Sequence, residues 1–319
     1  MSSQLENNVL PVQKRKSDSK LLRFLGQWQV QLMIFPGLLF IFVFNYIPMY
    51  GVLMSFQDYN IFKGFFASEW VGFKHFDAFF HSRDFVTVIR NTLVISGLKL
   101  LICFPAPIIL ALMLNEVNKM FFKRIVQTIS YLPHFLSWVI VVGFVNSILS
   151  VDNGSLNIFL QSIGLIDQPI NFLSEAEHFW TIIIGTNLWK EIGFSSIVYI
   201  AAIAGINPNL YEAAAIDGAS RLKQIFLITI PSIMPVIIIF MILNIGNLLN
   251  AGFEDLLLLG SHPILRDVAE VIDTYSYKVG LMSQRYSYAT AVGLFKAVIS
   301  VALLTLANTL ARRSGNSLW

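Results

Sequence analysis

Six stretches of this chain are almost free of charge, and each is long enough to cross a lipid bilayer as a helix, which takes about 20 mostly apolar residues. They cover residues 30–56, 91–116, 125–151, 178–206, 231–253 and 287–311. Only 13% of the 319 residues are charged, whereas roughly 25% is usual in soluble domains. The sequence therefore predicts an all-α integral membrane protein with a six-helix transmembrane domain over residues 29–312.

The basic residues near the ends of these stretches predict the orientation of the chain. With both chain ends in the cytoplasm, twelve Lys and Arg residues fall in short cytoplasmic segments and seven in the longer outer loops. Cytoplasmic loops carry an excess of basic residues, so this orientation is favoured. Residues 1–28 then form a basic cytoplasmic segment and residues 313–319 a cytoplasmic tail. The expected location is the inner or plasma membrane, with several passes.

The predicted cytoplasmic insert at residues 207–230 has the signals of a short, well-ended helix. Asn207-Pro208 is typical of a helix start, because Asn caps the first turn and Pro fits its fixed backbone. Asp217-Gly218 is typical of a helix stop followed by a turn. Ser220 is expected to cap a second short helix over residues 221–228. The insert is therefore predicted to be a rigid helix–turn–helix knob.

The same insert carries a spaced motif. Glu212-Ala213-Ala214 is followed after three residues by Gly218 and, nine residues later, by Ile228-Thr229-Ile230-Pro231. This pattern resembles the EAA loop of ABC-type importer permeases, which usually have Leu where Ile230 stands. The resemblance implies a cytoplasmic coupling helix that docks into a separate ATP-hydrolysing subunit. The residues that it assigns to this coupling are Glu212, Ala213, Ala214, Asp217, Gly218 and Pro231.

The chain also resembles maltose-type permeases, the carbohydrate-uptake family with the type I ABC importer fold, and within it the polysaccharide and oligosaccharide branch that includes alginate permeases. In that family, sugar-lining positions follow a Trp that precedes the EAA glutamate by 23 residues, which here is Trp189. An Asn pair in the fifth span also binds sugar hydroxyls. The resemblance implies a substrate pathway formed by Trp189, Lys190, Glu191, Phe194, Asn247 and Asn250.

A structural alternative stays open for these polar groups. Charges inside a bilayer are costly and usually face the bundle interior or a water-filled cavity. Lys190 and Glu191 replace an apolar residue and a Gly of the family pattern, and neighbouring helices could satisfy both charges. Asn244, Asn247 and Asn250 recur every three residues, which places them near one face of a helix. They could form hydrogen bonds between helices in place of contacts with a sugar.

Two further lysines lie within the predicted spans, and no catalytic motif accompanies them. Lys99 stands near a span end and is expected to extend toward the membrane surface. Lys296 could pair with Glu191 or line a cavity. Walker A, HExxH and G-x-S-x-G patterns are all missing from the sequence, so neither catalytic nor metal-binding residues are expected. Cys103 is the single cysteine, which excludes an intramolecular disulfide.

The function implied by the resemblance is that of a permease subunit and not of an enzyme. It would form half of the translocation pathway of an ATP-driven importer for an oligosaccharide, for example an acidic, alginate-derived one. The implied partners are a second homologous permease, two ABC ATPase subunits that bind ATP and Mg, an extracytoplasmic solute-binding protein and the bilayer. No cofactor in this chain and no nucleic acid are expected. Two alternatives stay open: a self-sufficient secondary transporter or channel for a small polar solute, and a membrane-embedded enzyme.

Overall fold

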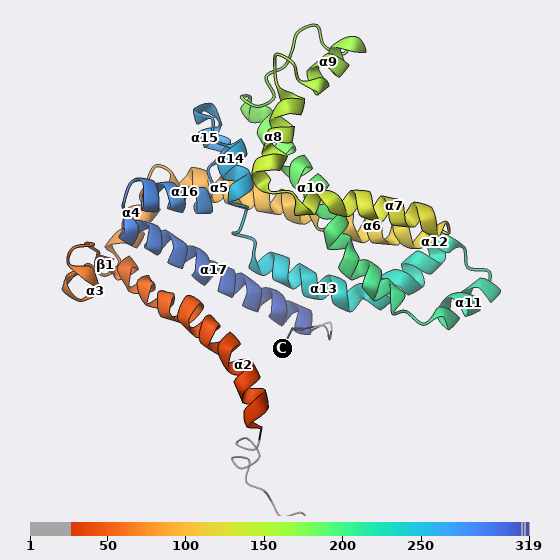
Figure 1. The fold of residues 1–319 in the computed structure, drawn as a ribbon, viewed down its shortest axis with the longest axis horizontal. Helices are drawn as coiled ribbons and strands as arrows, with labels where there is room; N and C mark the ends of the chain where they lie inside the picture. Colours follow the sequence, from red (N-terminus) through yellow and green to blue (C-terminus); the bar gives the residue numbers. More distant parts are fainter. Residues whose placement is uncertain (1–26, 314, 316, 319) are drawn as a thin grey trace, which may run out of the picture. The chain divides into compact units, whose positions relative to one another are not determined.

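The computed structural model describes residues 27–313, 315, 317 and 318 (Figure 1). Most of the predicted cytoplasmic segment, residues 1–28, lies outside the described residues. The described chain is almost entirely helical. It divides into two compact units, with the boundary between Val52 and Leu53.

The first unit is a single helical rod. Helix α2 (Trp28–Ile41) continues through a π turn, η1 (Phe42–Tyr46), into a 3-10 segment, η2 (Ile47–Phe56), which runs past the unit boundary. The combined stretch of 29 residues is long and apolar enough to cross a membrane. No residue of α2 is buried within the chain. A helix that is apolar on all sides suits a lipid or protein environment and not water.

The candidate membrane spans of the described chain include the rod of the first unit and several helices of the second unit. Four helical stretches of the described chain are long and apolar enough to cross a membrane, namely Trp28–Phe56, Phe85–Glu116, Arg221–Gly246 and Tyr286–Arg312. Two bent pairs meet the same criterion together, namely Met120–Phe135 with Trp138–Leu149 and Ala176–Ala204 with Pro208–Ile216. The described chain thus has four such spans, or up to six when each bent pair counts as one, which agrees with the predicted fold class.

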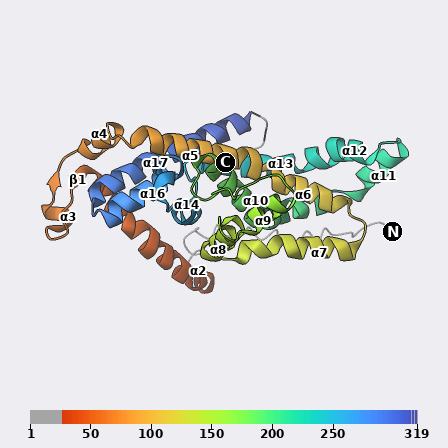
Figure 2. The same ribbon diagram turned by 90° about the horizontal axis from the view of Figure 1, so that it is seen from above.

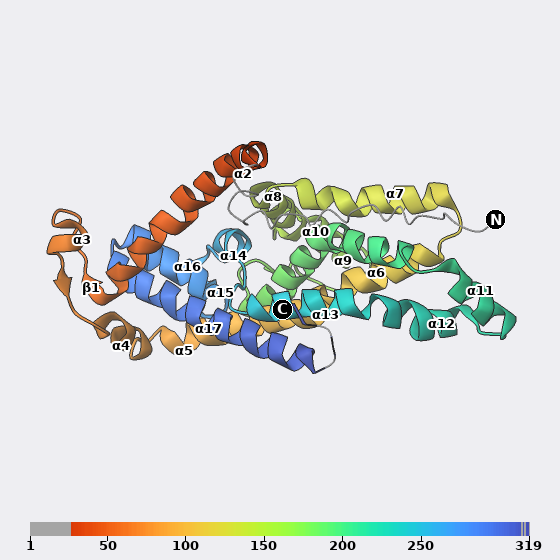
Figure 3. The same cartoon turned by 90° about the horizontal axis from the view of Figure 1, so that it is seen from below.

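Helix α10 (Ala176–Ala204) is the centre of this unit. It packs against α6 (Pro105–Glu116), α7 (Met120–Tyr131) and α13 (Ile230–Gly246), and α13 packs in turn against α17 (Tyr286–Arg312). Seen from above, α10 lies between α6 and α7 (Figure 2). Seen from below, α13 and α17 lie side by side (Figure 3). Groups carried by these helices can therefore meet inside the unit although they are far apart in sequence.

The third predicted span, residues 125–151, is not one straight helix. Helix α7 and the 3-10 turn η4 (Leu132–Phe135) are bent by 105° from α8 (Trp138–Leu149). The backbone is extended at Leu136 and Ser137, and the Ser137 side chain accepts a hydrogen bond from the amide of Ile140 as an N-cap. A helix of 12 residues such as α8 is only about 18 Å long, too short to cross the bilayer alone.

The fifth span differs from the prediction at both ends. The helix runs without a break from α12 (Arg221–Gln224) through the π turn η5 (Ile225–Thr229) into α13, so no second short helix ends at residue 228. Ser220 holds the N-cap position, but its side chain makes no capping hydrogen bond. The helix also stops at Gly246, seven residues before the predicted end at residue 253.

The remaining elements are short. They are β1 (Gln57–Asp58), α3 (Gly64–Ala67), β2 (Glu69–Trp70), α4 (Lys74–Phe80), α5 (Phe85–Leu98), η3 (Lys99–Cys103), α9 (Ser155–Ser162), α11 (Pro208–Ile216), α14 (Glu254–Leu259), η6 (Pro263–Leu265), α15 (Arg266–Ala269), α16 (Ile272–Tyr277) and η7 (Lys278–Met282). β1 and β2 pair antiparallel, with Gln57 opposite Trp70. Within the second unit, the α11–α12 knob and the β1–α3 region lie at opposite ends (Figure 1).

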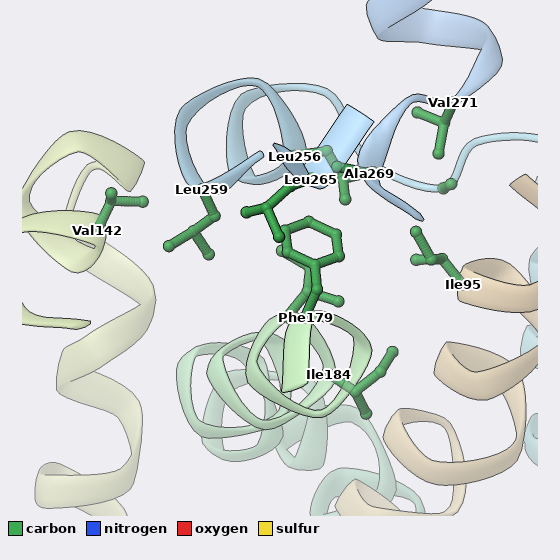
Figure 4. Packing of buried hydrophobic residues seen from close by; sticks show 11 residues of the cluster. Ile95, Val142, Phe179, Ile184, Leu256, Leu259, Leu265, Ala269 and Val271 are labelled. Atoms are coloured by element: carbon green, nitrogen blue, oxygen red, sulfur yellow. The ribbon is translucent and has the colours of Figure 1, made fainter. Parts of the chain in front are cut away.

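The largest buried cluster fixes the segment that follows α13. Phe179 of α10 points from its helix toward Leu256, Leu265 and Ala269 of the α14–α15 region (Figure 4). Ile95 of α5 packs against the same cluster. Each fully buried Phe, Leu or Ile side chain of this cluster contributes roughly 1.5–3 kcal/mol through loss of apolar surface from water. The segment between α13 and α16 is therefore held firmly against α5 and α10.

Candidate functional site

The α11 knob has both of the helix ends that its sequence predicts. The side chain of Asn207 accepts a hydrogen bond from the amide of Asn209, and Pro208 occupies the first turn. At the other end Gly218 has a φ of +78°. The amide of Gly218 donates to the Ala215 carbonyl at 3.1 Å, and the next amide donates to the carbonyl of Ala214 at 2.8 Å. This pair of bonds is the Schellman motif, which ends a helix abruptly and needs a left-handed residue.

Two long-range contacts fix the knob to the rest of the unit. The hydroxyl of Tyr211 lies 2.8 Å from that of Thr229 in η5. Arg221 of α12 pairs with Glu116 at the end of α6, at 3.3 Å. The knob is therefore braced through both of its helices, against α6 and against the helical stretch that continues into α13.

The outer side of the knob is left free. Of the predicted coupling residues, Glu212, Ala213, Asp217, Gly218 and Pro231 are exposed and Ala214 is half-buried. Ile216, on the same helix, is 86% exposed. The Glu212 carboxylate forms no hydrogen bond or ion pair with any part of the chain that the structure describes. Small, acidic and apolar side chains are thus presented together on one rigid protrusion.

A cavity of about 400 Å³ lies inside the second unit between the long helices. Its walls come from α5, η3, α6, α10, α13 and the turn after α13. The polar and aromatic side chains that line it are Ser96, Lys99, Phe104, Asn187, Glu191, Phe194, Ser195, Tyr199, Phe240, Asn244, Asn247 and Asn250. Four of the predicted pathway residues, Glu191, Phe194, Asn247 and Asn250, are therefore brought together on one cavity.

Asn247 and Asn250 lie on a turn and not on a helix face as predicted. Helix α13 ends at Gly246, which packs so closely on Leu304 of α17 that a Cβ would lie 2.7 Å from that side chain. The backbone N–H of Asn250 then donates to the backbone carbonyl of Asn247 at 2.8 Å. Asn244, one turn earlier, is still on the helix and lines the same cavity. The last turn of α13 and the tight turn after it together place all three side-chain amides at the cavity wall.

Lys99 and Asp255 form an ion pair beside this turn. The Lys99 ammonium donates to an Asp255 carboxylate oxygen at 2.8 Å and to the Ala251 carbonyl at 2.7 Å. Asn187 of α10 donates to the same carboxylate at 3.2 Å. Lys99 therefore points into the unit and lines the cavity, whereas the sequence predicts that it extends toward the membrane surface. The pair links η3, α10 and the segment that carries the Asn turn.

Lys190 and Trp189 do not line the cavity. The Lys190 side chain is buried, and its ammonium donates to the His134 carbonyl at 2.7 Å and lies 5.4 Å from the ring centre of Trp138. Trp189 is half exposed and lines apolar grooves beside α7 and α8 instead. The Glu191 carboxylate of the same helix also lies 3.5 Å from this ammonium. Lys190 is therefore satisfied within the protein, by η4 and by its own helix neighbour.

Glu191 joins the cavity to the bend between α7 and α8. Its carboxylate accepts a hydrogen bond from the Nδ1 atom of His134 at 2.7 Å. The His134 ring stacks on Phe194, with ring centres 3.8 Å apart. Next to them, Gly193 lets α10 approach α7 so closely that a Cβ would lie 2.0 Å from the Ser130 carbonyl. The cavity wall and the bend are therefore one connected structure.

The ammonium of Lys296 is bonded to other residues than the Glu191 that the sequence suggested. Its ammonium contacts the Asp273 carboxylate of α16 and the side-chain oxygen of Asn250. Glu191 is not among its partners. Lys296 thus stands directly behind the Asn turn, on α17.

The sequence does not predict the polar cluster that Lys99, Asp255 and Asn187 form at this site. Asn187 had a detectable signal, because residues 187, 191, 194 and 198 follow the helical period on α10 and all line the cavity. Asp255 lies in a predicted outer loop 156 residues from Lys99. No local pattern in the sequence indicates such a contact.

Comparison with known proteins assigns the chain to a family. Residues 104–316 match the model of the binding-protein-dependent transport system inner membrane component family. The chain belongs to this family. It is thus a transport component of the inner membrane, as the sequence resemblance implied.

Relatives of this inner membrane component match over almost its whole length. It is 46% identical to the polygalacturonan/rhamnogalacturonan transport system permease protein YteP of Bacillus subtilis, over 95% of this chain and 93% of that protein. It is also 46% identical to protein LplB of Bacillus subtilis, over 88% of each. A solved bacterial alginate ABC transporter, in complex with an alginate pentasaccharide-bound periplasmic protein, contains a chain that is 43% identical. That match covers 94% of this chain and 99% of the other, with a TM-score of 0.86.

Proposed function

We propose that this inner membrane component is the permease subunit of an ATP-driven importer of acidic oligosaccharides. The observation that carries the proposal is the cavity between α5, α6, α10 and α13, which is lined by amides, hydroxyls, aromatic rings, the Glu191 carboxylate and a lysine. Two relatives support the acidic class, since one is named for polygalacturonan and the other transports the acidic polysaccharide alginate. Uronate sugars carry hydroxyl groups and carboxylates, which match this set of donors and acceptors.

In this proposal the pathway residues divide into two groups. Glu191, Phe194, Asn247 and Asn250 contact the oligosaccharide, with the exposed part of the Phe194 ring as a surface on which a sugar ring packs. Trp189 and Lys190 support the wall from outside the cavity, because the Lys190 ammonium is already bonded to the His134 carbonyl. Lys99 also lines the wall, where its ammonium is paired with the Asp255 carboxylate, so this pair adds hydrogen-bond donors to the wall without net charge.

Energy for transport comes from partner subunits in this proposal. Two ABC ATPases bind ATP and Mg and receive the α11 knob, through Glu212, Ala213, Ala214, Asp217, Gly218 and Pro231. The exposed and braced geometry of the knob supports this role, because a rigid protrusion transmits motion to α6 and α13 through its two anchoring contacts. A second homologous permease completes the pathway, and an extracytoplasmic binding protein delivers the sugar.

Both chain ends are proposed to lie in the cytoplasm. The bias of basic residues supports this orientation, and it places the α11 knob on the side where ATP is available. Reporter fusions after residues 20 and 315 are expected to give cytoplasmic signals from both sites in intact cells. A cytoplasmic signal at one site and an external signal at the other would require an odd number of spans and contradict the proposed topology.

Uptake by the complete transporter tests the proposed function. The permease pair, the ATPases and the binding protein are reconstituted in proteoliposomes, and labelled trigalacturonate is supplied outside. We expect uptake that needs enclosed ATP and the binding protein, and that maltotriose, a neutral sugar, fails to inhibit. A non-hydrolysable ATP analogue serves as the control. Uptake that proceeds equally with the analogue would favour the alternative of a self-sufficient transporter or channel, and inhibition by maltotriose would contradict the acidic substrate class.

A further inference from the structure

A chain of side-chain hydrogen bonds runs from α17 to the cavity wall. Lys296 donates to the side-chain oxygen of Asn250. The Asn250 amide nitrogen donates to the side-chain oxygen of Asn247 at 3.0 Å. The Asn247 amide nitrogen donates to the backbone carbonyl of Leu243 at 3.1 Å. Both amides line the cavity and are exposed to it, while Lys296 lies behind them and is largely covered.

The direction of this chain is set by its first member. A lysine ammonium has three donors and no acceptor, whereas an Asn side chain has both. Lys296 therefore holds Asn250 with its oxygen turned toward α17, and the Asn250 side-chain nitrogen in turn engages the oxygen of Asn247. Neither amide can rotate by 180° without placing a nitrogen donor against a donor. The orientation of both amides follows from one charged group that does not itself line the cavity.

This orientation leaves the cavity facing N–H groups. Each amide nitrogen carries two hydrogens and uses one of them within the chain, so Asn247 and Asn250 each keep one donor for a ligand. Each of their oxygens already accepts one hydrogen bond within the chain. A ligand with acceptor oxygens gains hydrogen bonds there, and bonds to a charged acceptor are about twice as strong as those to a neutral one.

The charge of Lys296 is itself neutralised. Asp273 of α16 forms an ion pair with it, so the pair as a whole carries no net charge. A free ammonium in the wall would hold an anion tightly by charge, which hinders its release into the next part of a pathway. Neutral N–H donors with a fixed direction discriminate in favour of carboxylates and still allow release.

We propose that Lys296 is a positioning residue that makes the cavity select carboxylate-bearing sugars, by fixing the donor orientation of Asn250 and Asn247. The inference rests on the proposed function, since it names how the same cavity would recognise its substrate class. It assigns the preference to directed amides and not to an exposed positive charge.

Two probes separate recognition of the carboxylate from recognition of the sugar. Trigalacturonate and its fully methyl-esterified form share the same sugar rings and hydroxyl groups, but each charged carboxylate of the first is an uncharged methyl ester in the second. Their dissociation constants are measured on the complete permease–ATPase complex in nanodiscs without the binding protein, so that the preferences of that protein do not enter. The ratio of the two constants is the readout, because a general loss of folding would affect both probes.

Three variants decide between orientation and charge. Lys296→Met/Asp273→Leu removes a neutral pair, so the net charge is conserved while Asn250 becomes free to rotate. We expect its preference for the acidic probe to fall about tenfold, the effect of losing a directed bond to a charged acceptor. Lys296→Arg keeps a donor-only group and is expected to retain the preference within about twofold. The control is Lys278→Met, which removes a lysine of η7 that is paired with Glu270. It should leave the ratio unchanged.

The outcomes separate this inference from the function on which it rests. A wild-type complex that binds neither probe, or binds both equally, would overturn the acidic substrate class and this inference together. The inference alone would be overturned if the wild-type complex prefers the acidic probe and the Lys296→Met/Asp273→Leu variant keeps the same ratio of the two dissociation constants. Loss of the preference in the double variant, with rescue in Lys296→Arg, supports it.

Discussion

Replacing Gly218 with arginine is expected to reduce ATP-driven uptake to background while the permease still assembles in the membrane. Gly218 ends α11 in the left-handed conformation, at a φ of +78°, which costs other residues roughly 1–2 kcal/mol. No atom lies within 4 Å of the Cβ position, so the new side chain extends outward and does not disturb the packing of the helices. It projects from the exposed side of the knob, where we propose that the ATPase binds. Glu212→Arg is expected to act in the same way, by reversing a charge on that surface.

The matched control for this prediction is Gly164→Arg. Gly164 follows α9 in a predicted outer loop, has a φ of +71° and also has no atom within 4 Å of its Cβ position. It therefore introduces the same backbone strain and the same side chain at a site away from the knob. Uptake and the stimulation of ATP hydrolysis by loaded binding protein are measured in proteoliposomes for all variants. Wild-type stimulation in both Gly218→Arg and Glu212→Arg would remove the coupling role from α11.

The sequence predicts the α11 knob well because its ends depend on local chemistry. Asn207, Pro208 and Gly218 each act through bonds or backbone angles within a few residues, and the structure contains all three features. The approximate positions of the long apolar helices also follow from composition, since the bilayer requires about 20 apolar residues for each span. Such features depend little on the rest of the fold.

Features that depend on tertiary contacts are predicted less well. The bend before α8 follows from Ser137 capping a new helix inside a continuous apolar stretch, where hydropathy shows no change. The end of α13 at Gly246 depends on the close approach of α17, and Asn247 and Asn250 therefore leave the helix that their spacing suggests. The cavity itself needs α5, η3, α6, α10 and α13 to meet the turn that follows α13. The sequence identifies four of its residues by resemblance but not the groups that orient them.

Replacing Lys99 with methionine is expected to be the most destabilising single change in the cavity wall. Lys99 is the only ammonium bonded to Asp255 in the part of the chain that the structure describes, and the Asp255 side chain is 3% exposed. Removing one partner of a buried ion pair leaves the other charge without compensation, which costs about 3–5 kcal/mol. For a chain of this size we expect a fall in Tm on the order of 10 °C, measured by thermal unfolding of the solubilised complex.

Two further variants show whether burial is the cause. Lys99→Met/Asp255→Leu removes both charges and is expected to recover most of the lost Tm, but not all, because Asn187 then loses its acceptor on Asp255. Lys74→Met breaks an ion pair of nearly the same length, 2.7 Å to Asp58, whose side chains are 59% and 51% exposed. Solvent screens such a pair, so its Tm should change little. If Lys99→Met and Lys74→Met lower the Tm equally, or if the double variant is less stable than Lys99→Met, the Lys99–Asp255 pair does not hold the cavity wall together by charge compensation. In that case the apolar cluster around Phe179 would be what positions the Asn turn.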